Sequence, residues 1–293
     1  MTNKKIYIFM VCSTLFWSGA FIAGKYTVPY IPTFTLTFLR FFFATIILYF
    51  VMKRMKEPYK LTKDHIPIFL FTGMIGMFGY HVLFFTALKY TTAINSSIIA
   101  ATNPIVTVLL ALLFLKNKLT RKQLAGVMIS FVGVFLTITG AKIDVIKSLS
   151  FNVGDIWMLA AVVAWSAYAI FCRSKGKEIP SISLTYYSFL VCTIILIPFT
   201  IYERPWTFLL TVPMTAYAAV LYMSIFPSVI GYLVQQMAIK EIGPSKAAIF
   251  INLVPVFSIL LAVMILGETF APIKLLTAGL IIIGVLICQR ESI

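Results

Sequence analysis

The sequence predicts an all-α polytopic membrane protein, with ten transmembrane helices arranged as two inverted five-helix repeats. Three observations lead to this prediction. Hydrophobic residues make up 61% of the chain and charged residues only 11%, which is far from the composition of a soluble domain. Apolar segments of about 20 residues recur, and each is long enough to cross about 30 Å of hydrocarbon as a helix. The second half of the chain repeats the first.

Ten apolar segments fit a membrane span, and the connections between them are too short to hold a separate soluble domain. We expect the spans at 6–27, 33–52, 66–88, 93–115, 121–140, 153–173, 182–202, 213–238, 245–266 and 271–289. The first span follows two lysines, as the apolar part of a signal peptide does. Its length and its repeat partner around Trp165 indicate instead that it is retained.

Residue matches at a fixed spacing define the repeat. A shift of 148 residues aligns Trp17 with Trp165, and a shift of 151 aligns Pro104 with Pro255. The predicted units are a first repeat over 1–140, a connecting loop over 141–152 and a second repeat over 153–293. Because each repeat holds an odd number of spans, the second must cross the membrane in the opposite sense. Inverted repeats of this kind are typical of secondary transporters.

The net charge of +15 follows from membrane topology. Of the 24 Lys and Arg residues, 17 fall in segments expected on one side of the membrane and 6 on the other, while Arg40 lies inside a span. Cytoplasmic loops carry this kind of excess, so we expect both termini in the cytosol and a multi-pass protein of the cytoplasmic membrane. A nucleic-acid partner is not expected.

Two prolines mark the middle of spans four and nine. Pro104 and Pro255 each remove a helix hydrogen bond and disturb the carbonyl four residues earlier. Loosened backbone is tolerated in a membrane where it is buried in protein or lines a cavity. The matched positions favour a pair of gating kinks beside a cavity over an isolated bend, and Asn103 and Asn252 add polar groups at the same depth.

Ionisable residues deep in a membrane are costly and therefore candidates for function. Arg40 lies near the middle of span two. Its guanidinium either pairs with a substrate carboxylate or phosphate or bonds neighbouring helix carbonyls in a structural role, which we favour. His81 in span three is either a proton-coupling group or a neutral hydrogen-bonding residue, and both readings remain open.

The acidic residues exclude two classes of function. All nine lie in predicted loops or near span ends, so no carboxylate is expected at the midplane for proton-coupled export of lipophilic cations. A membrane enzyme that binds pyrophosphate through Asp-rich motifs and Mg²⁺ is excluded in the same way. The four cysteines show no C-x-x-C spacing. We therefore expect no enzymatic activity, no cofactor and no metal.

Aromatic and amide residues complete the candidate substrate site. Trp and Tyr near span ends are usually interfacial, but the two repeat-related tryptophans lie near mid-span. The predicted site residues are Trp17, Tyr80, His81, Asn95, Asn103, Trp165, Tyr168, Tyr232, Asn252 and Arg40. Spans five and ten are rich in glycine, which lets membrane helices approach closely, and we expect these two spans to serve packing.

These marks resemble the EamA-like exporters of the drug/metabolite transporter (DMT) superfamily, over nearly the whole chain. The resemblance rests on LVPVFSILLAVMILGE in span nine, on its echo TNPIVTVLLALLFL in span four, on FLRFFFA in span two and on the Trp-Ser pair of span one. The first copy departs from the pattern, because Lys116-Asn117 stand where the second copy has Gly267-Glu268.

The resemblance implies a central cavity lined by spans one, three, four, six, eight and nine, with spans five and ten peripheral. It would leave Arg40, on span two, behind the lining. Members of the family mostly export amino acids and related metabolites, and others carry sugars, nucleotide sugars or choline.

The function expected from the sequence is alternating-access transport, with export of small polar metabolites such as amino acids. The alternative is an exchanger or importer of anionic substrates such as sugar phosphates or nucleotide sugars, which would use Arg40 together with Lys25 or Lys246. The expected partners are the small-molecule substrate and the lipid bilayer, and the expected state is a monomer or weak homodimer.

Overall fold

The structure is a computed structural model that describes residues 3–54, 62–115, 120–140, 152–176, 179–242 and 250–290. These ranges are helical, and no strand occurs within them. Of the predicted connecting loop, only Asn152 lies among the described residues; its side chain accepts a hydrogen bond from the Gly154 N–H at the start of a helix (2.7 Å). Lys116, Asn117 and Lys246 fall outside the described residues.

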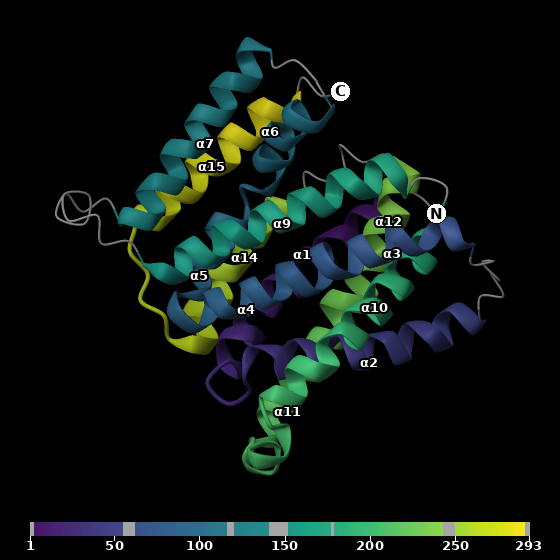
Figure 1. Cartoon of the computed structure of the whole chain (residues 1–293). Helices are drawn as coiled ribbons and strands as arrows, with labels where there is room; N and C mark the ends of the chain where they lie inside the picture. Colours follow the sequence, from purple (N-terminus) through teal and green to yellow (C-terminus); the bar gives the residue numbers. More distant parts are fainter. Residues whose placement is uncertain are drawn as a thin grey trace.

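Helices of the two sequence halves interleave in one bundle (Figure 1). In the first half they are α1 (Asn3–Thr27), α2 (Thr33–Arg54), α3 (Ile66–Phe71), α4 (Tyr80–Tyr90), α5 (Ala93–Ala100), α6 (Asn103–Leu115) and α7 (Arg121–Thr139). In the second half they are α9 (Val153–Lys175), α10 (Ser181–Tyr202), α11 (Met214–Met223), α12 (Gly231–Ile242), α14 (Val254–Leu261) and α15 (Ile273–Arg290). Short 3₁₀ turns occupy Lys63–His65, Pro205–Thr207 and Leu209–Thr211, and π-helical segments occupy Thr72–Gly79, Ser224–Ile230 and Ala262–Leu266.

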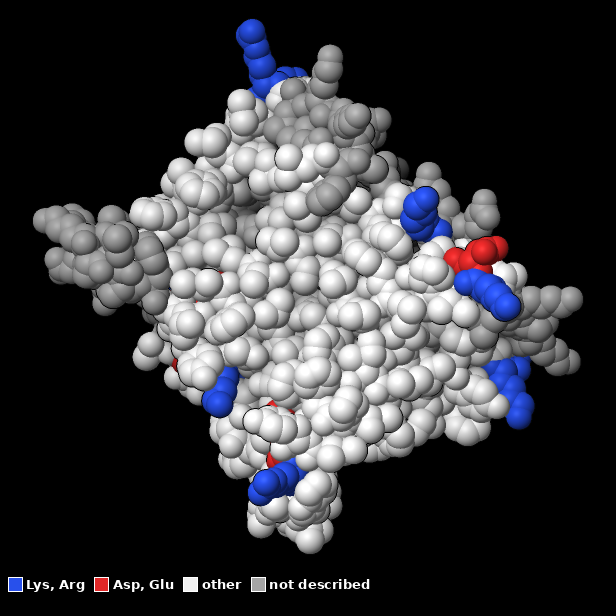
Figure 2. Space-filling model, in the orientation of Figure 1, with Lys and Arg blue, Asp and Glu red and all other residues white. Residues whose placement is uncertain are grey.

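The bundle is that of a multi-pass membrane protein. Within the described residues, eight helical segments are long and apolar enough to cross a membrane, and two shorter apolar helices, Val254–Leu266 and Ile273–Ile287, fall in the last two predicted spans. Figure 2 shows Lys and Arg at the edges of the molecule and a broad band of uncharged residues between them. An uncharged band between charged ends suits the hydrocarbon layer of a bilayer.

Predicted spans four and nine are each broken in the middle. The α-helix stops at residues 101–102 and again at 252–253, which are 151 residues apart. Pro104 and Pro255 lie in the first turn of the helices that restart there, α6 and α14. A proline lacks the N–H that a continuing helix needs but is tolerated in a first turn. The prolines therefore produce full helix breaks, where the sequence predicted kinks in continuous spans.

Spans three and eight each contain a π-helical segment that the sequence did not predict. The segments Thr72–Gly79 and Ser224–Ile230 occupy nearly equivalent places in the two halves. The second contains Pro227. In the first, a Cβ built on Gly76 would lie 2.2 Å from the Tyr168 ring, so only glycine lets that ring pack on the backbone. Such π bulges in helices often lie at functional sites.

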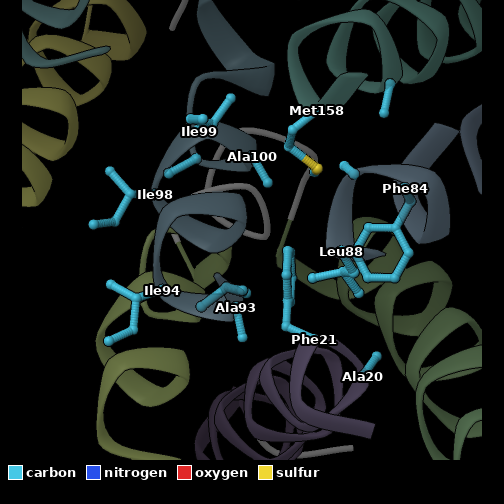
Figure 3. Close-up of a cluster of buried hydrophobic side chains, with 14 of the residues drawn as sticks. Ala20, Phe21, Phe84, Leu88, Ala93, Ile94, Ile98, Ile99, Ala100 and Met158 are labelled. Atoms are coloured by element: carbon cyan, nitrogen blue, oxygen red, sulfur yellow. The ribbon is translucent and has the colours of Figure 1, made fainter. Parts of the chain in front are cut away.

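The largest buried cluster lies where α1, α4, α5 and α9 meet (Figure 3). Lipid offers apolar side chains nearly the same environment as the protein interior, so close packing supplies most of the stabilisation here. Among its fully or almost fully buried members are Phe21, Phe84, Leu88, Ala93, Ile94, Ile98, Ile99 and Met158. The cluster packs α4 and α5 against α1.

Helices α7 and α15 pair along their length at one side of the bundle (Figure 1). Their backbones approach closely, because a Cβ built on Gly284 would lie 2.5 Å from the Gly126 carbonyl oxygen and 2.5 Å from the Ser130 hydroxyl. Ser130 Oγ donates across the pair to the Ile281 carbonyl (3.0 Å). Small residues serve helix packing here, as the sequence predicted.

Gly284→Ala is therefore expected to lower the melting temperature of the purified protein, because overpacking costs about 1–3 kcal/mol. Gly279→Ala on the same helix is the matched control, since nothing lies within 4 Å of the added Cβ. That control should be neutral or slightly stabilising, because alanine is the better helix former. Equal melting temperatures for the two variants would contradict the close α7–α15 contact.

Candidate substrate-binding site

A cavity of about 100 Å³ lies at the centre of the bundle, between the broken spans and helices α1, α2, α4, α9 and α12. The structure places seven predicted site residues in its wall: Trp17, Arg40, Tyr80, His81, Asn103, Trp165 and Tyr232. The other lining residues are Ala20, Phe21, Phe84, Ala100, Ala101, Gln235, Ile251 and Val254. Most of these are small or apolar, so no chemical mark in the sequence distinguishes them from ordinary packing residues.

Aromatic rings form a continuous wall along one side of the cavity. The ring centroids of Tyr80 and Trp165 lie 4.9 Å apart, and those of Trp165 and Tyr232 lie 6.0 Å apart. Trp17 also lines the cavity, and its indole N–H donates to the Pro227 carbonyl (3.1 Å) in the π segment of span eight. Packed rings lose little freedom when a ligand binds, so this wall suits an apolar or aromatic group.

Arg40 is 4% exposed and lies in the cavity wall. Its Nε donates to Ser228 Oγ (3.0 Å), and that hydroxyl donates in turn to the Met223 carbonyl (2.8 Å). The guanidinium lies over the Phe41 and Phe85 rings, 5.7 and 5.9 Å from their centroids. The structure thus places on the cavity an arginine that the sequence favoured as a structural residue behind the lining.

His81 lines the cavity, with one ring nitrogen held by the backbone. Its Nδ1 lies 2.9 Å from the Met77 carbonyl oxygen. Because a carbonyl can only accept, the geometry assigns the hydrogen to Nδ1 and leaves Nε2 with a lone pair in the neutral ring. The ring is 2% exposed and packs edge-on against Phe41 and Tyr80, with centroids 4.6 and 4.7 Å apart.

The two helix breaks are fastened by matching serines. Ser166 Oγ donates to the Asn103 carbonyl (3.2 Å), and Ser18 Oγ shares its hydrogen between the Val254 carbonyl (3.0 Å) and the Thr14 carbonyl of its own helix (2.7 Å). A shift of 148 residues relates the two serines, and a shift of 151 relates the two acceptors. Asn103 also has a buried side-chain oxygen with no hydrogen-bond partner among the described residues. It is an unsatisfied acceptor beside the cavity.

Three predicted site residues lie outside the cavity wall. Asn95 points its amide at the Asp155 carboxylate (3.3 Å). Tyr168 packs behind Trp165, with ring centroids 5.1 Å apart. Asn252 lies in the second helix break, 5% exposed, and neither its side-chain oxygen nor its nitrogen has a partner within the described chain. The only sign in the sequence that Asn95 lies outside the cavity wall is its hydrogen-bond partner Asp155, which stands 60 residues later.

Polar contacts close one end of the bundle. Carboxylates of the second half reach helix starts of the first: Glu268 accepts from the Ala93 N–H (2.7 Å) and Glu203 from the Thr35 N–H (2.7 Å). A carboxylate is favourable at a helix N-terminus. At the same end, Lys25 Nζ donates to the carbonyls of Leu88 (2.8 Å) and Thr91 (2.7 Å). We call this region the Asp155 end, after the buried carboxylate that lies there.

Nothing in the described ranges gathers three or more His, Cys, Asp or Glu residues as a metal site would. Membrane-length helices around a central cavity, with aromatic walls and a buried cation, define the class of membrane transport proteins. The chain belongs to the EamA-like transporter family, within the drug/metabolite transporter superfamily, since residues 4–139 and residues 152–289 each match that family.

Relatives agree with this assignment, and a solved structure shares the fold. The uncharacterized transporter YyaM of Bacillus subtilis (strain 168) is 33% identical, over 98% of this chain and 94% of its own length. An uncharacterized transporter of Archaeoglobus fulgidus is 30% identical over 91% of each chain. A probable terminal-alkyne amino-acid exporter of Streptantibioticus cattleyicolor is 26% identical over 78% of this chain and 74% of that protein. A crystal structure of a protein with 19% identity has the same fold, with a TM-score of 0.64 over 99% of both chains.

Proposed function

We propose that the protein is an alternating-access carrier that exports small polar metabolites, such as amino acids, across the cytoplasmic membrane. The observation that carries this proposal is the central cavity, which lies where both broken spans meet the paired tryptophans. Broken helices beside a midplane cavity are a recurrent design of secondary transporters. The two helix breaks and their serine contacts supply the points about which two halves would rock.

We further propose that the fold is a ten-span bundle of two inverted five-helix repeats, with units at 1–140 and 153–293. Two separate matches to one family support the repeat. So do contacts between residues at the repeat spacing: Thr45 Oγ1 lies 3.4 Å from Thr193 Oγ1, 148 residues away, and Ser130 donates to Ile281, 151 residues away. Such contacts are expected where a pseudo-twofold axis passes between the two residues.

The charge asymmetry of the sequence supports an orientation. The segments with 17 of the 24 Lys and Arg residues would face the cytosol, together with both termini. The Asp155 end, with Lys25, Glu203 and Glu268, would then face outward. Under this assignment the hydrogen bonds that Glu203 and Glu268 of the second half accept from the first half would hold the outer end closed.

Size and chemistry favour a small metabolite over a sugar phosphate or nucleotide sugar. The cavity of about 100 Å³ is smaller than the roughly 300–1,000 Å³ of pockets for drug-sized ligands. A relative with 26% identity is named a probable terminal-alkyne amino-acid exporter. Of the cations that the anionic alternative would use, Lys25 is bound to two backbone carbonyls. Lys246 lies outside the described residues, and Arg40 lies in the cavity wall.

Efflux from preloaded proteoliposomes tests the proposal. The labelled solutes are leucine, phenylalanine, glutamate, lysine, choline and glucose 6-phosphate, and protein-free liposomes are the control. We expect saturable efflux of the neutral amino acids, because the cavity wall is mostly apolar. Efflux of glucose 6-phosphate alone would favour the anionic alternative, and efflux no faster than from protein-free liposomes for every solute would contradict the carrier proposal.

A further inference from the structure

We propose that the substrate binds through a carboxylate held by Arg40, and that this carboxylate, rather than an ammonium group, is the charge the site requires. The inference rests on the proposed transport function and names its substrate class: small carboxylates with an apolar or aromatic body. These include neutral amino acids and also the oxo acids that lack their amino group.

The first step is the missing counter-ion of Arg40. The side chain is 4% exposed, yet within the described residues no Asp or Glu forms an ion pair with it, and its one hydrogen bond goes to the neutral Ser228. A charge deep in a membrane protein is costly unless it is paired. Because Arg40 lines the cavity, an anion bound there would supply the partner that the protein does not.

The second step is the geometry of the guanidinium. Ser228 occupies Nε and leaves both terminal NH₂ groups without a protein acceptor among the described residues. Two such groups bind one carboxylate through two parallel hydrogen bonds. The Ser228 hydroxyl is itself fixed, because it donates to Met223 five residues earlier in the π segment. The π segment therefore orients Arg40 with its fork free to face the cavity.

The third step is the charge of the remaining wall. Its lining includes no acidic residue, so no ionic partner for an ammonium group is present. The acceptors that it offers are neutral: the unpartnered Asn103 oxygen and, by the assignment above, His81 Nε2. An amino group can be accommodated by them but is not required. Among the described lining residues Arg40 is the only Lys or Arg, so these residues offer a phosphate dianion no second cation.

Four compounds that share the isobutyl group of leucine separate these requirements. They are L-leucine, its amide L-leucinamide, its oxo acid 4-methyl-2-oxopentanoate, and 3-methylbutylamine, which lacks the carboxyl group. Thermal stabilisation of the purified full-length protein measures binding, and counterflow in proteoliposomes measures transport. We expect leucine and the oxo acid to stabilise the protein and to be transported, and the amide and the amine to do neither.

Arg40→Gln is the decisive variant, with Arg54→Gln at the exposed end of the same helix as its control. Arg40→Gln should weaken leucine and oxo-acid binding by more than tenfold. Without ligand it should melt at or above the wild-type temperature, because it removes an unpaired buried charge. A simple folding defect would instead lower that temperature. Ser228→Ala, a change in a positioning residue, should weaken binding less than Arg40→Gln.

Each outcome separates the inference from the proposed function. If leucinamide is transported as well as leucine, the carrier proposal stands and the carboxylate inference fails. If the carboxylates stabilise the wild-type protein but are not transported, the inference stands and the carrier proposal fails. If neither carboxylate stabilises the protein, or Arg40→Gln still prefers leucine over its amide, the inference is wrong.

Discussion

Replacing Asp155 by alanine is expected to lower the melting temperature of the protein by about 10 °C. The carboxylate is fully buried in the first turn of α9, and it accepts from the Thr91 hydroxyl (2.6 Å) and the Asn95 amide (3.3 Å). Hydrogen bonds to a charged group contribute about 1.5–3 kcal/mol each. In a chain of this length 1 kcal/mol corresponds to about 2 °C, so losing both bonds, about 3–6 kcal/mol, gives a shift of about 10 °C.

Asp64→Ala is the matched control, because Asp64 is an exposed carboxylate in the described part of the chain. Its melting temperature should stay within about 1–2 °C of wild type, as for most surface changes. The exchange Asp155→Asn with Asn95→Asp restores an acceptor beside a donor and should recover part of the loss. If Asp155→Ala and Asp64→Ala have the same melting temperature, the hydrogen bonds of Asp155 with Thr91 and Asn95 do not stabilise the fold.

The hydrogen bonds at the Asp155 end also bear on transport, because they join the two halves. Asp155, Glu203 and Glu268 all belong to the second half, and all bind helix ends of the first. If the halves rock about the central cavity, these contacts must break when this end opens. Their strength therefore sets how strongly the closed state of that end is favoured.

The sequence correctly predicted the features that depend on the length of apolar segments or on a fixed spacing between repeated residues. The apolar segments are helices, and the shift of 151 residues correctly paired the prolines at which spans four and nine are interrupted. Proline chemistry explains why the interruption could be predicted. The form of the interruption could not be predicted. The helix ends and restarts because a new first turn can contain proline, and whether it does so depends on how the two helical pieces pack.

The sequence named Arg40 as a candidate site residue, but the contacts that hold it at the cavity could not be predicted, because they join residues far apart in the sequence. Its hydrogen-bond partner Ser228 lies 188 residues later, in a π segment that the pattern of apolar residues does not predict. The resemblance to the family places span two behind the cavity. The side chain of Arg40 is nevertheless long enough to reach the cavity wall. Asn95 is the converse case, since Asp155 turns its amide away from the cavity.

The two repeat-related tryptophans provide the last prediction, because they share a place in the cavity but differ in hydrogen bonding. The Trp17 indole donates to the Pro227 carbonyl (3.1 Å), whereas Trp165 makes no side-chain hydrogen bond among the described residues. Trp17→Phe leaves that carbonyl without its donor, at a cost of about 1–3 kcal/mol. Pro227 adjoins Ser228, so the loss is transmitted to the residue that orients Arg40.

We therefore expect Trp17→Phe to raise the KM for leucine about tenfold, the equivalent of about 1.4 kcal/mol, while Trp165→Phe changes it less than threefold. Counterflow in proteoliposomes with varied leucine measures both values. The phenyl ring keeps an aromatic wall in each variant, so a general need for aromatic packing predicts equal effects. Equal effects would place the role of Trp17 in packing alone. A selective Trp17 effect would show that the two halves, though alike in sequence, contribute differently to one site: the first half gives the cation and the second gives the π segment that orients it.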